Sequence, residues 1–542
     1  MLTSTRTLIP GDIVGHGTKA DYRRLAEGPG ERHVRRRELA PSSASDAPRQ
    51  RARALAVFVH LTDLHVMDPS SPTRLDVLGR LGAKDKWRDL LGGAFRTQET
   101  LTAHAAAQMA RTIAIETGPF SGRSADVAIV TGDNIDNCQA NELANYIAAL
   151  EGGTVRPAPK WGYEGVQTLE WDDDWYWQPD GDSDRLQNAW GFPRIAGLLD
   201  VVARPFSAAG LGMPWLACFG NHDALLMGTA RANDAARVLA VGAAKPRGAS
   251  IPGGRNVAGV GVVSTLADVD DPLDAYLADP TSLLAGPVVP ITADATRRVI
   301  DRDDFLAAHF GPASRPHGHG FAAPSGHAYY VYDIDNVRIV MLDTTHPAGY
   351  WEGSIDTAQL AWLDDVLADA DRRQLLVIVA SHHATPSLIN TYRAADGSGA
   401  PAEGERHLAA DLVAVLHRHR CVIGWLNGHH HANRIVAHRR EEPGDGGGGF
   451  WEMTTSAIID WPCQARTVEV LDEGDGHVSI VTTMIDFADP AVPAADGDPV
   501  SFCASLHREL AANQAWQRGA TAMEGEGLDR NAMLLLPHPF AR

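Results

Sequence analysis

The stretch CVIGWLNGHHH, residues 421–431, joins an apolar run to three consecutive histidines. The apolar part has the composition of a buried strand, so the histidines are expected at its carboxyl end. If the extended geometry continues, successive side chains point to opposite sides, and His429 and His431 face one point while His430 faces away. Two imidazoles do not yet make a metal site. A solvated, histidine-rich loop therefore remains an alternative until the chain offers further ligands.

Five other apolar runs end on polar residues in the same way. They are ALAVFVHLTDLH (54–65), DVAIVTGD (126–133), PWLACFGNHD (214–223), VRIVMLDTT (337–345) and LLVIVASHH (375–383). Helical patterns lie between several of these runs, at 102–116, 356–371 and 406–419. Alternating strands and helices predict the α/β class, in which ligands gather at the carboxyl ends of the strands.

The composition is that of an ordinary globular protein, with 542 residues, 44% of them hydrophobic and 21% charged. The formal net charge of −20 disfavours binding to a nucleic-acid polymer or an anionic membrane, but a small phosphoester remains compatible with it. Five scattered cysteines indicate neither a disulfide framework nor a thiolate zinc site. No apolar run approaches the roughly 20 residues of a membrane span, and the first residues lack a secretory pattern. These features predict a cytoplasmic protein, whereas the oligomeric state is not indicated.

The chain divides by composition into three parts. Residues 1–53 are expected to form an irregular arm, residues 54–490 the main domain, and residues 491–542 a helical C-terminal tail. Insertions at about 151–210, 241–326 and 384–405 interrupt the main domain and are expected to cap its core. Four further strands are predicted after residue 432, and no repeat of fixed period is found.

The polar ends of the apolar runs collect carboxylate, amide and imidazole groups, which are ligands that suit Zn, Mn and Fe. The candidates are Asp63, His65, Asp133, Asn221, His222, His382, His383, His429 and His431. They are too many for one ion, but their number suits two ions that share a carboxylate. A single Asp-x-His is weak evidence for a metal site. Five sets of ligand residues, each at a strand end, are strong evidence.

In this order the motifs DLH, GDNID, GNHD, SHH and GHHH resemble the calcineurin-like metallophosphoesterase superfamily over most of residues 55–485. The resemblance implies an α/β fold (α+β by some schemes) with a two-sheet β-sandwich core flanked by helices. It also implies a dinuclear centre of divalent or trivalent transition-metal ions, Mn, Fe or Zn. Carried over motif by motif, it assigns the seven ligands as follows: Asp63, His65 and His431 on one ion, Asn221, His382 and His429 on the other, and Asp133 as the bridge. His222 is then the catalytic histidine.

This chain departs from the family pattern in two ways. The intervals between Asp133 and Asn221 and between His222 and His382 are longer than in compact members, which predicts accessory elements over the site. The sequence SHHATP also lacks a proline directly after the histidine pair, so the choice between His382 and His383 stays open. The family pattern favours His382 as the ligand and places His383 beside the substrate pocket.

Three polar residues near the motifs have two interpretations each. Asp136 is expected to support a ligand or cap a helix, and the alternative is that it binds a metal itself. Asp223 either positions His222 or solvates a loop, and His346 lies either at the rim of the site or on the plain surface.

Two other features look like sites but have simpler explanations. His317 and His319 resemble a metal-binding pair, yet they follow no apolar strand, so we expect a solvated loop. The aromatic segment EWDDDWYWQPD (170–180) would serve as a stacking wall for a base or sugar, but packing of an insertion is the favoured interpretation. Its three aspartates, Asp172 to Asp174, are expected to face water.

The sequence therefore predicts a metal-dependent phosphoester hydrolase, either a phosphatase or a phosphodiesterase. A hydroxide held by the two metals would attack phosphorus in line, without a covalent enzyme intermediate, and His222 would protonate the leaving oxygen. Two alternatives remain: a dinuclear hydrolase of a non-phosphate ester, and a catalytically silent metal-binding scaffold or interaction module. The intact His222 argues against the scaffold, which needs ligands but no acid. The sequence does not specify the substrate.

Overall fold

The computed structural model describes most of the chain, namely residues 1–40, 52–79, 93–159, 162–251, 255–258, 276–281, 287–393, 405–440, 447–494, 496–514 and 521–541. Two large sheets contain the apolar runs predicted as strands. The strand order of the first, seven-stranded sheet is β3-β23-β22-β21-β4-β5-β8. Its strands are β3 (Val34–Arg36), β4 (Arg53–Leu61), β5 (Val127–Val130), β8 (Trp215–Ala217), β21 (Ala465–Asp472), β22 (His477–Ile485) and β23 (Ala532–Pro537).

The second sheet has six strands in the order β13-β14-β16-β18-β20-β19. They are β13 (Tyr330–Ile334), β14 (Val337–Met341), β16 (Leu376–Ala380), β18 (Val422–Asn427), β19 (Arg434–Arg439) and β20 (Gly449–Thr454). The strands β4-β5-β8 are parallel in the first sheet, and β14-β16-β18-β20 are parallel in the second. Antiparallel strands lie beside each parallel group, so both sheets are mixed. The predicted mixed α/β class is confirmed.

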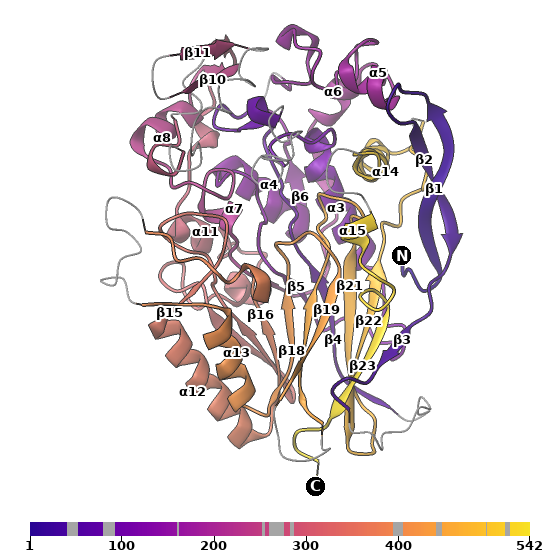
Figure 1. Cartoon of the computed structure of the whole chain (residues 1–542), viewed down its shortest axis with the longest axis vertical. Helices are drawn as coiled ribbons and strands as arrows, with labels where there is room; N and C mark the ends of the chain where they lie inside the picture. The colour runs from indigo at the N-terminus through magenta and orange to yellow at the C-terminus, as the bar shows by residue number, and fades with distance from the viewer. Residues whose placement is uncertain are drawn as a thin grey trace.

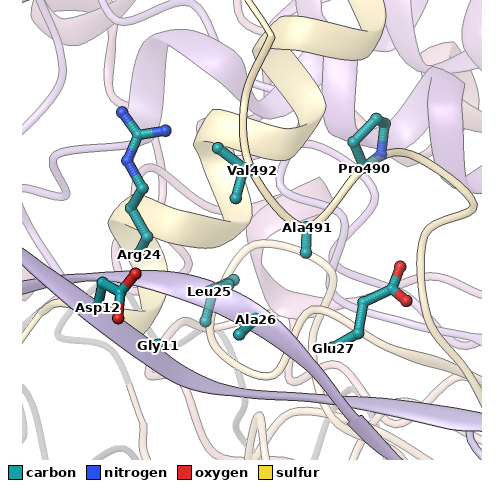
Figure 2. Close-up of a pocket in the computed structure, with 9 residues that line it drawn as sticks. All are labelled: Gly11, Asp12, Arg24, Leu25, Ala26, Glu27, Pro490, Ala491 and Val492. Atoms are coloured by element: carbon teal, nitrogen blue, oxygen red, sulfur yellow. The ribbon is translucent and has the colours of Figure 1, made fainter.

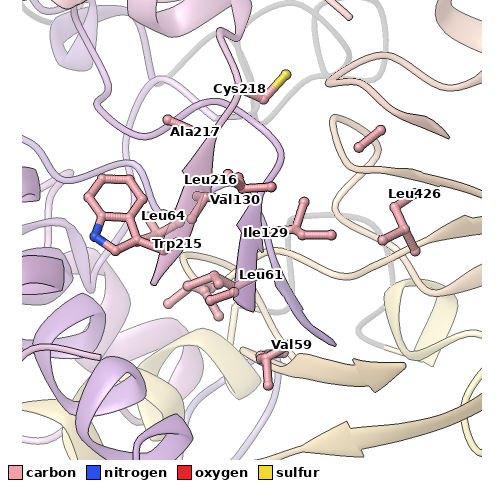
Figure 3. Packing of buried hydrophobic residues seen from close by; sticks show 14 of the residues in the cluster. Val59, Leu61, Leu64, Ile129, Val130, Trp215, Leu216, Ala217, Cys218 and Leu426 are labelled. Atoms are coloured by element: carbon pink, nitrogen blue, oxygen red, sulfur yellow. The ribbon is translucent and has the colours of Figure 1, made fainter. Parts of the chain in front are cut away.

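The residues of β14 and β16 alternate between two apolar clusters, as the two-residue period of a strand requires. Ile339 and Ile378 belong to a central cluster that also contains Phe58 and Ile129 of the first sheet. The neighbouring Val340 packs instead in a cluster with the adjacent helices. Figure 3 shows side chains of the central cluster, with Leu61, Ile129 and Leu216 from the first sheet and Leu426 from the second. The parallel strands are therefore buried on both faces, which explains their near-continuous apolar sequences.

The main helices pack on these sheets. Helices α12 (Thr357–Arg373) and α13 (Ala409–Arg418) lie together beside the second sheet, while α3 (Thr102–Ile113), α4 (Ala140–Glu151) and α14 (Pro499–Ala512) lie with the first (Figure 1). Helix α12 begins where the Asp356 carboxylate accepts a hydrogen bond of 2.7 Å from the backbone N–H of Gln359. It ends at Gln374, which is left-handed with φ 57°. The predicted helices are thus present within a few residues of their expected ends.

The remaining described elements are shorter, and they lie both inside and outside the predicted insertions. The helices are α5 (Arg185–Trp190), α6 (Leu198–Val202), α7 (Asn221–Ala224), α8 (Asp234–Ala240), α11 (Arg302–Ala308) and α15 (Thr521–Glu524). The small two-stranded pairs are β6 (Gly153–Val155) with β7 (Phe206–Ala208), β9 (Ala244–Pro246) with β12 (Val288–Pro290), β10 (Gly248–Ile251) with β11 (Arg255–Ala258), and β15 (Ile355–Asp356) with β17 (Arg406–His407).

Both ends of the chain differ from the sequence prediction. The segment expected to be an irregular arm forms a hairpin of β1 (Arg6–Gly15) and β2 (Tyr22–Pro29) at one side of the molecule (Figure 1). Strand β3 then pairs in parallel with β23, so the expected helical tail also contributes a strand. Helix α14 within that tail is present as predicted. The prediction missed β3 and β23 because these pairing partners lie about 500 residues apart, a relation that no local pattern records.

The structure also bears on the membrane and cysteine predictions. Among the helices that the structure describes, none combines the length and apolar character of a membrane span. All five cysteines are buried and unpaired.

Candidate metal centre

The predicted ligands follow the carboxyl ends of five parallel strands, where the edges of the two sheets meet. Asp63 and His65 follow β4, Asp133 follows β5, Asn221 and His222 follow β8, His382 follows β16, and His429 and His431 follow β18. All of them are buried or partly buried. The structure thus brings together groups that lie up to 368 residues apart in the chain, because the strands that carry them are neighbours in the sheets.

Five of these residues have left-handed backbones, an arrangement that is uncommon outside glycine. They are Asp63, His65, Asp133, His429 and His431, with φ between 45° and 67°. The strand β18 ends at Asn427, so His429 and His431 do not alternate along an extended chain, and that part of the sequence argument is wrong. Turns, rather than an extended strand, orient the rings of His429 and His431 toward the site. Backbone strain of this kind concentrates at functional sites.

One group of ligand atoms surrounds Nε2 of His382. It lies 2.9 Å from Oδ1 of Asn221, 3.2 Å from Nδ1 of His429 and 3.2 Å from Oδ2 of Asp133. The other ring nitrogen, Nδ1, donates to the carbonyl of Thr131 at 2.8 Å, which fixes the orientation of the ring. The side-chain amide of Asn221 is also fixed, since its Nδ2 donates to the Gly228 carbonyl at 2.9 Å and leaves Oδ1 toward His382.

A second group forms around Oδ1 of Asp63. This oxygen lies 3.2 Å from Nε2 of His431 and 4.0 Å from Nε2 of His65. Each histidine is held from behind by a carboxylate: Nδ1 of His431 hydrogen bonds to Asp460 at 2.7 Å, and Nδ1 of His65 to Asp136 at 3.0 Å. Carboxylates in this position fix the tautomer of a metal-binding histidine and make it a stronger ligand.

Asp133 lies between the two groups. Its Oδ2 is 3.7 Å from Nε2 of His65 and 3.2 Å from Nε2 of His382, while its Oδ1 accepts a hydrogen bond of 2.8 Å from the backbone N–H of His222. One carboxylate oxygen therefore faces a histidine from each group. This is the position that a bridging ligand needs.

The donor set fits metal ions. Among the residues that the structure describes, four groups of histidine and carboxylate side chains have ligand atoms within 4.8 Å of one another, and all four lie in this region: His382, His383 and His429; Asp63, His65 and His431; His65, Asp136 and His222; Asp63, Asp133 and His382. Nε2 of His65 is buried and has no hydrogen-bond partner among the described residues. Such an atom is costly to bury unless something else completes its contacts, and a metal ion would do so.

The charges at the centre are strongly coupled. Burial opposes ionisation of Asp133, but His382 and His222 outweigh this effect and hold its pKa well below the usual range. Burial also lowers the pKa of His382, yet Asp133 and Asp63 raise it to about 9. The pKa of His431 likewise rises to about 9, because Asp63 and Asp460 outweigh burial. The carboxylates thus attract cations to the centre, which are protons when no metal is bound.

Part of this chain is similar in sequence to a known metal-dependent enzyme. A curated relative, the manganese-dependent ADP-ribose/CDP-alcohol diphosphatase of Xenopus laevis, is 27% identical over 123 residues. The aligned part covers 21% of this chain and 28% of that protein, so less than a third of the relative's length is matched. This partial match to a manganese-dependent diphosphatase agrees with the motif resemblance to calcineurin-like metallophosphoesterases.

Two other comparisons do not identify a family for this chain. No protein-family model matches the chain. A solved structure, a dimetal phosphatase from Danio rerio, is 12% identical with a TM-score of 0.32, and the match covers 80% of this chain and 100% of that one. A likeness this low supports no argument about the fold or the site. The metallophosphoesterase resemblance therefore depends on the sequence motifs and the curated relative.

His222, the residue that the metallophosphoesterase motifs mark as catalytic, lies beside both groups. Its Nδ1 hydrogen bonds to the Asp136 carbonyl at 2.6 Å, and its ring packs edge-on against that of His65 at 4.5 Å between centroids. A Cβ added at Gly228 would lie 2.4 Å from Nε2 of His222, so this glycine lets the 225–230 turn approach the ring closely. Burial lowers the pKa of His222 to about 4.

His383 is engaged elsewhere. Its Nδ1 hydrogen bonds to the Thr344 hydroxyl at 2.8 Å and its Nε2 to the Trp351 carbonyl at 2.9 Å. The strand β16 ends at Ala380, before both histidines, so strand geometry does not decide between them. Because both ring nitrogens of His383 have partners, the contacts favour His382 as the ligand.

The structure distinguishes between the two interpretations of Asp136 and of Asp223. Asp136 caps no helix: it contacts His65 and also forms an ion pair with the buried Arg74. Asp223 is buried and solvates no loop, since it accepts hydrogen bonds from the backbone N–H groups of Asn134, Ile135 and Gly220. It therefore fastens the Asp133 loop to the Asn221 turn rather than contacting the His222 ring.

Three expectations outside the centre can also be compared with the structure. His319 is buried, stacked on Trp215 and in contact with His309, so the expectation of a solvated loop is wrong for it, whereas His317 is exposed. His346 is buried, which excludes a plain surface position. Within the 170–180 segment, Trp171, Tyr176 and Trp177 are buried in a second apolar cluster, so they pack the insertion as favoured.

Sequence reasoning missed the residues behind the ligands. Asp460, which holds His431, is itself paired with Arg96 through two contacts of 2.9 and 3.0 Å. Neither residue belongs to a motif, and no local signal marks them.

A cavity of about 390 Å³ lies away from the ligands, between the β1–β2 hairpin and Pro490 to Val492 (Figure 2). None of the residues that line it is a predicted ligand.

Proposed function

We propose that this protein is a metal-dependent phosphoester hydrolase with a dinuclear centre. The observation that carries the proposal is Asp133, whose Oδ2 faces His382 at 3.2 Å and His65 at 3.7 Å, with two further predicted ligands on each side. In the proposed assignment, Asp63, His65 and His431 hold one ion and Asn221, His382 and His429 hold the other. Two ions in such a centre supply an activated water and a clamp for phosphate oxygens. The two large sheets would form the sandwich that supports the centre.

His222 is proposed as the residue that acts on the leaving group. Its Nδ1 is engaged with the Asp136 carbonyl, so Nε2 is the nitrogen that remains to contact substrate. With a pKa of about 4, only a small fraction is protonated near neutral pH. The proposed role therefore requires the bound phosphate anion to raise the pKa of His222, and the protonated ring then donates to the leaving oxygen, a contribution commonly worth about 10²–10⁴-fold in rate. Asp136 and the 225–230 turn keep the ring in place.

The substrate is proposed at the level of chemical class. The relative is named for action on ADP-ribose and CDP-alcohols, which contain a diphosphate, and manganese is the metal in its name. We therefore propose a small phosphoester or diphosphate substrate and Mn, Fe or Zn as the metals. The net charge of −20 disfavours a nucleic-acid polymer.

The proposal is tested with metal-loaded protein and generic substrates. Purified protein is loaded with Mn, Fe or Zn, its metal content is measured, and hydrolysis of an aryl phosphate monoester, an aryl phosphodiester, a nucleoside diphosphate and an aryl carboxylic ester is assayed. We expect turnover of at least one phosphorus substrate, lost on chelation and in Asp133→Asn. Turnover of a carboxylic ester alone would favour the non-phosphate hydrolase. Two bound metals with no turnover of any substrate would favour the scaffold.

A further inference from the structure

An array of three aromatic rings lies on two loops that no sequence motif marks, and the backbone of one loop contacts residues of the candidate metal centre. The rings of Tyr350 and Trp351 stack with 4.1 Å between centroids and 19° between planes. A third ring, Tyr392, is nearly parallel to Tyr350 at 6.3 Å. All three side chains are partly exposed, unlike the buried aromatics of the 170–180 segment. Partly exposed, parallel rings provide a surface on which another planar ring can stack.

Backbone contacts tie this array to both sides of the centre. The Trp351 carbonyl accepts the 2.9 Å hydrogen bond from His383, and the ring of His383 lies 4.5 Å from that of His429. On the other side, the Tyr350 N–H donates to the Thr229 carbonyl at 2.8 Å. The next residue back, Gly228, is the one that packs against His222. The array is therefore one or two contacts away from the proposed leaving-group histidine and from the ligand His429.

The loop is held in a strained shape. Tyr350 has φ 76°, a value that is unfavourable for a bulky residue. Asn390 fastens the loop by donating to the carbonyls of Gly349 and Glu352 at 3.0 and 2.7 Å. The indole N–H of Trp351 also donates to Glu352 at 3.2 Å, which restricts the plane of the ring. Strain maintained by several contacts is typical of ligand-binding segments.

We propose that Tyr350 and Trp351 form a stacking subsite for a planar aromatic ring, such as a nucleobase, attached to the phosphate group at the metal centre. This inference rests on the proposed function, because it assumes that a phosphate binds at the centre. Stacking recognises the flat face of a ring and tolerates different bases. The subsite would therefore select aromatic phosphoesters over sugar or alkyl phosphates, without specifying one base.

The test is equilibrium binding rather than turnover. Adenosine 5′-monophosphate and ribose 5-phosphate differ by the adenine ring, so calorimetric titration of metal-loaded protein with each isolates the contribution of the ring. We expect the nucleotide to bind about tenfold or more tightly than the sugar phosphate. Trp351→Leu should remove most of this preference and leave the binding of ribose 5-phosphate unchanged, while Trp351→Phe should retain most of it.

Two further variants complete the design. Trp362→Ala is the matched control, since Trp362 is also partly exposed and pairs with a different ring, Tyr329, at 4.6 Å. It should leave both affinities unchanged. If Trp351→Leu does not fold, Tyr350→Leu serves in its place and should show the same loss.

Equal binding of the two probes by the unaltered protein would overturn the inference, as would a loss for both probes in Trp351→Leu. These results are distinct from failure of the proposed function. A protein that prefers the nucleotide but hydrolyses no phosphoester retains the subsite and loses the catalytic proposal, whereas a hydrolase without ring preference loses only the subsite.

Discussion

Metal binding to this protein should be strongly dependent on pH, because protons occupy two of the proposed ligands. His382 and His431 each have a pKa of about 9, raised by the carboxylates of the centre. A metal ion requires a neutral imidazole, so each ion must displace one proton below that pH. At pH 7 about one ring in a hundred is neutral. The apparent affinity for each ion should therefore be about 100-fold weaker at pH 7 than above pH 9, or about 2.7 kcal/mol at 1.36 kcal/mol per pH unit.

The stability of the protein should change with pH in the opposite sense when metal is removed. A histidine whose folded pKa is raised from 6.5 to about 9 stabilises the fold fully below pH 6.5, and this contribution is lost as the pH rises to 9. His222 and His383, with pKa values of about 4 and 3, remain neutral across that window and do not contribute to it. The increase in Tm on adding Mn²⁺ should consequently grow between pH 6.5 and 9.

The assay is calorimetric titration of metal-free protein with Mn²⁺ at several pH values. Repeating each titration in buffers of different ionisation enthalpy counts the protons released. We expect close to one proton per ion near pH 7.5 from these two histidines, and none above about pH 10. Affinity and proton release that stay constant from pH 6.5 to 9 would refute the reasoning, because the carboxylates would then not hold protons at the centre.

The remaining predictions concern single residues. Asp133→Asn should lose at least one metal along with activity, and retention of both ions in metal analysis would exclude Asp133 as the bridge. His222→Ala should keep both metals but lose about 10²–10⁴-fold in turnover on poor leaving groups and less on activated aryl esters, and equal losses would contradict an acid role. His382→Ala should deplete metal while His383→Ala keeps two ions, so metal lost only from the second variant would reverse the assignment. Asp223→Ala should lower the free energy of unfolding by about 3 kcal/mol in urea denaturation, because it leaves several buried N–H groups unpaired, and a change below about 1 kcal/mol would show that the loops hold without it.

The strands and the residues that follow them were predictable because both depend on short, continuous stretches of sequence. An apolar run of the right length forms a buried strand wherever it lies, and β4, β5, β16 and β18 appear where the sequence places them. Parallel strands then bring their carboxyl ends to one edge whatever the loops between them. The sequence therefore predicts that Asp63, Asp133 and His429 lie together.

The sequence could not supply the contacts between distant segments. Asp460 behind His431, and Arg74 behind Asp136, have no motif, because each is defined only by the partner that the fold brings near. The same holds for β3 and β23, whose pairing joins the two ends of the chain. His319 was misjudged for a related reason, since its burial depends on Trp215 from another strand.

The sequence by itself determined which chemical groups this protein gathers, because their positions follow from local hydrophobic patterns and from motif residues at strand ends. Only the tertiary structure decided how those groups are used. It placed both ring nitrogens of His383 on other partners, one of them the Trp351 carbonyl, and set Oδ2 of Asp133 between the two ligand groups. The physical reason is that hydrogen-bond partners, charge coupling and ring contacts depend on distances of a few ångströms between residues far apart in the chain. Such distances are fixed when the sheets and loops pack.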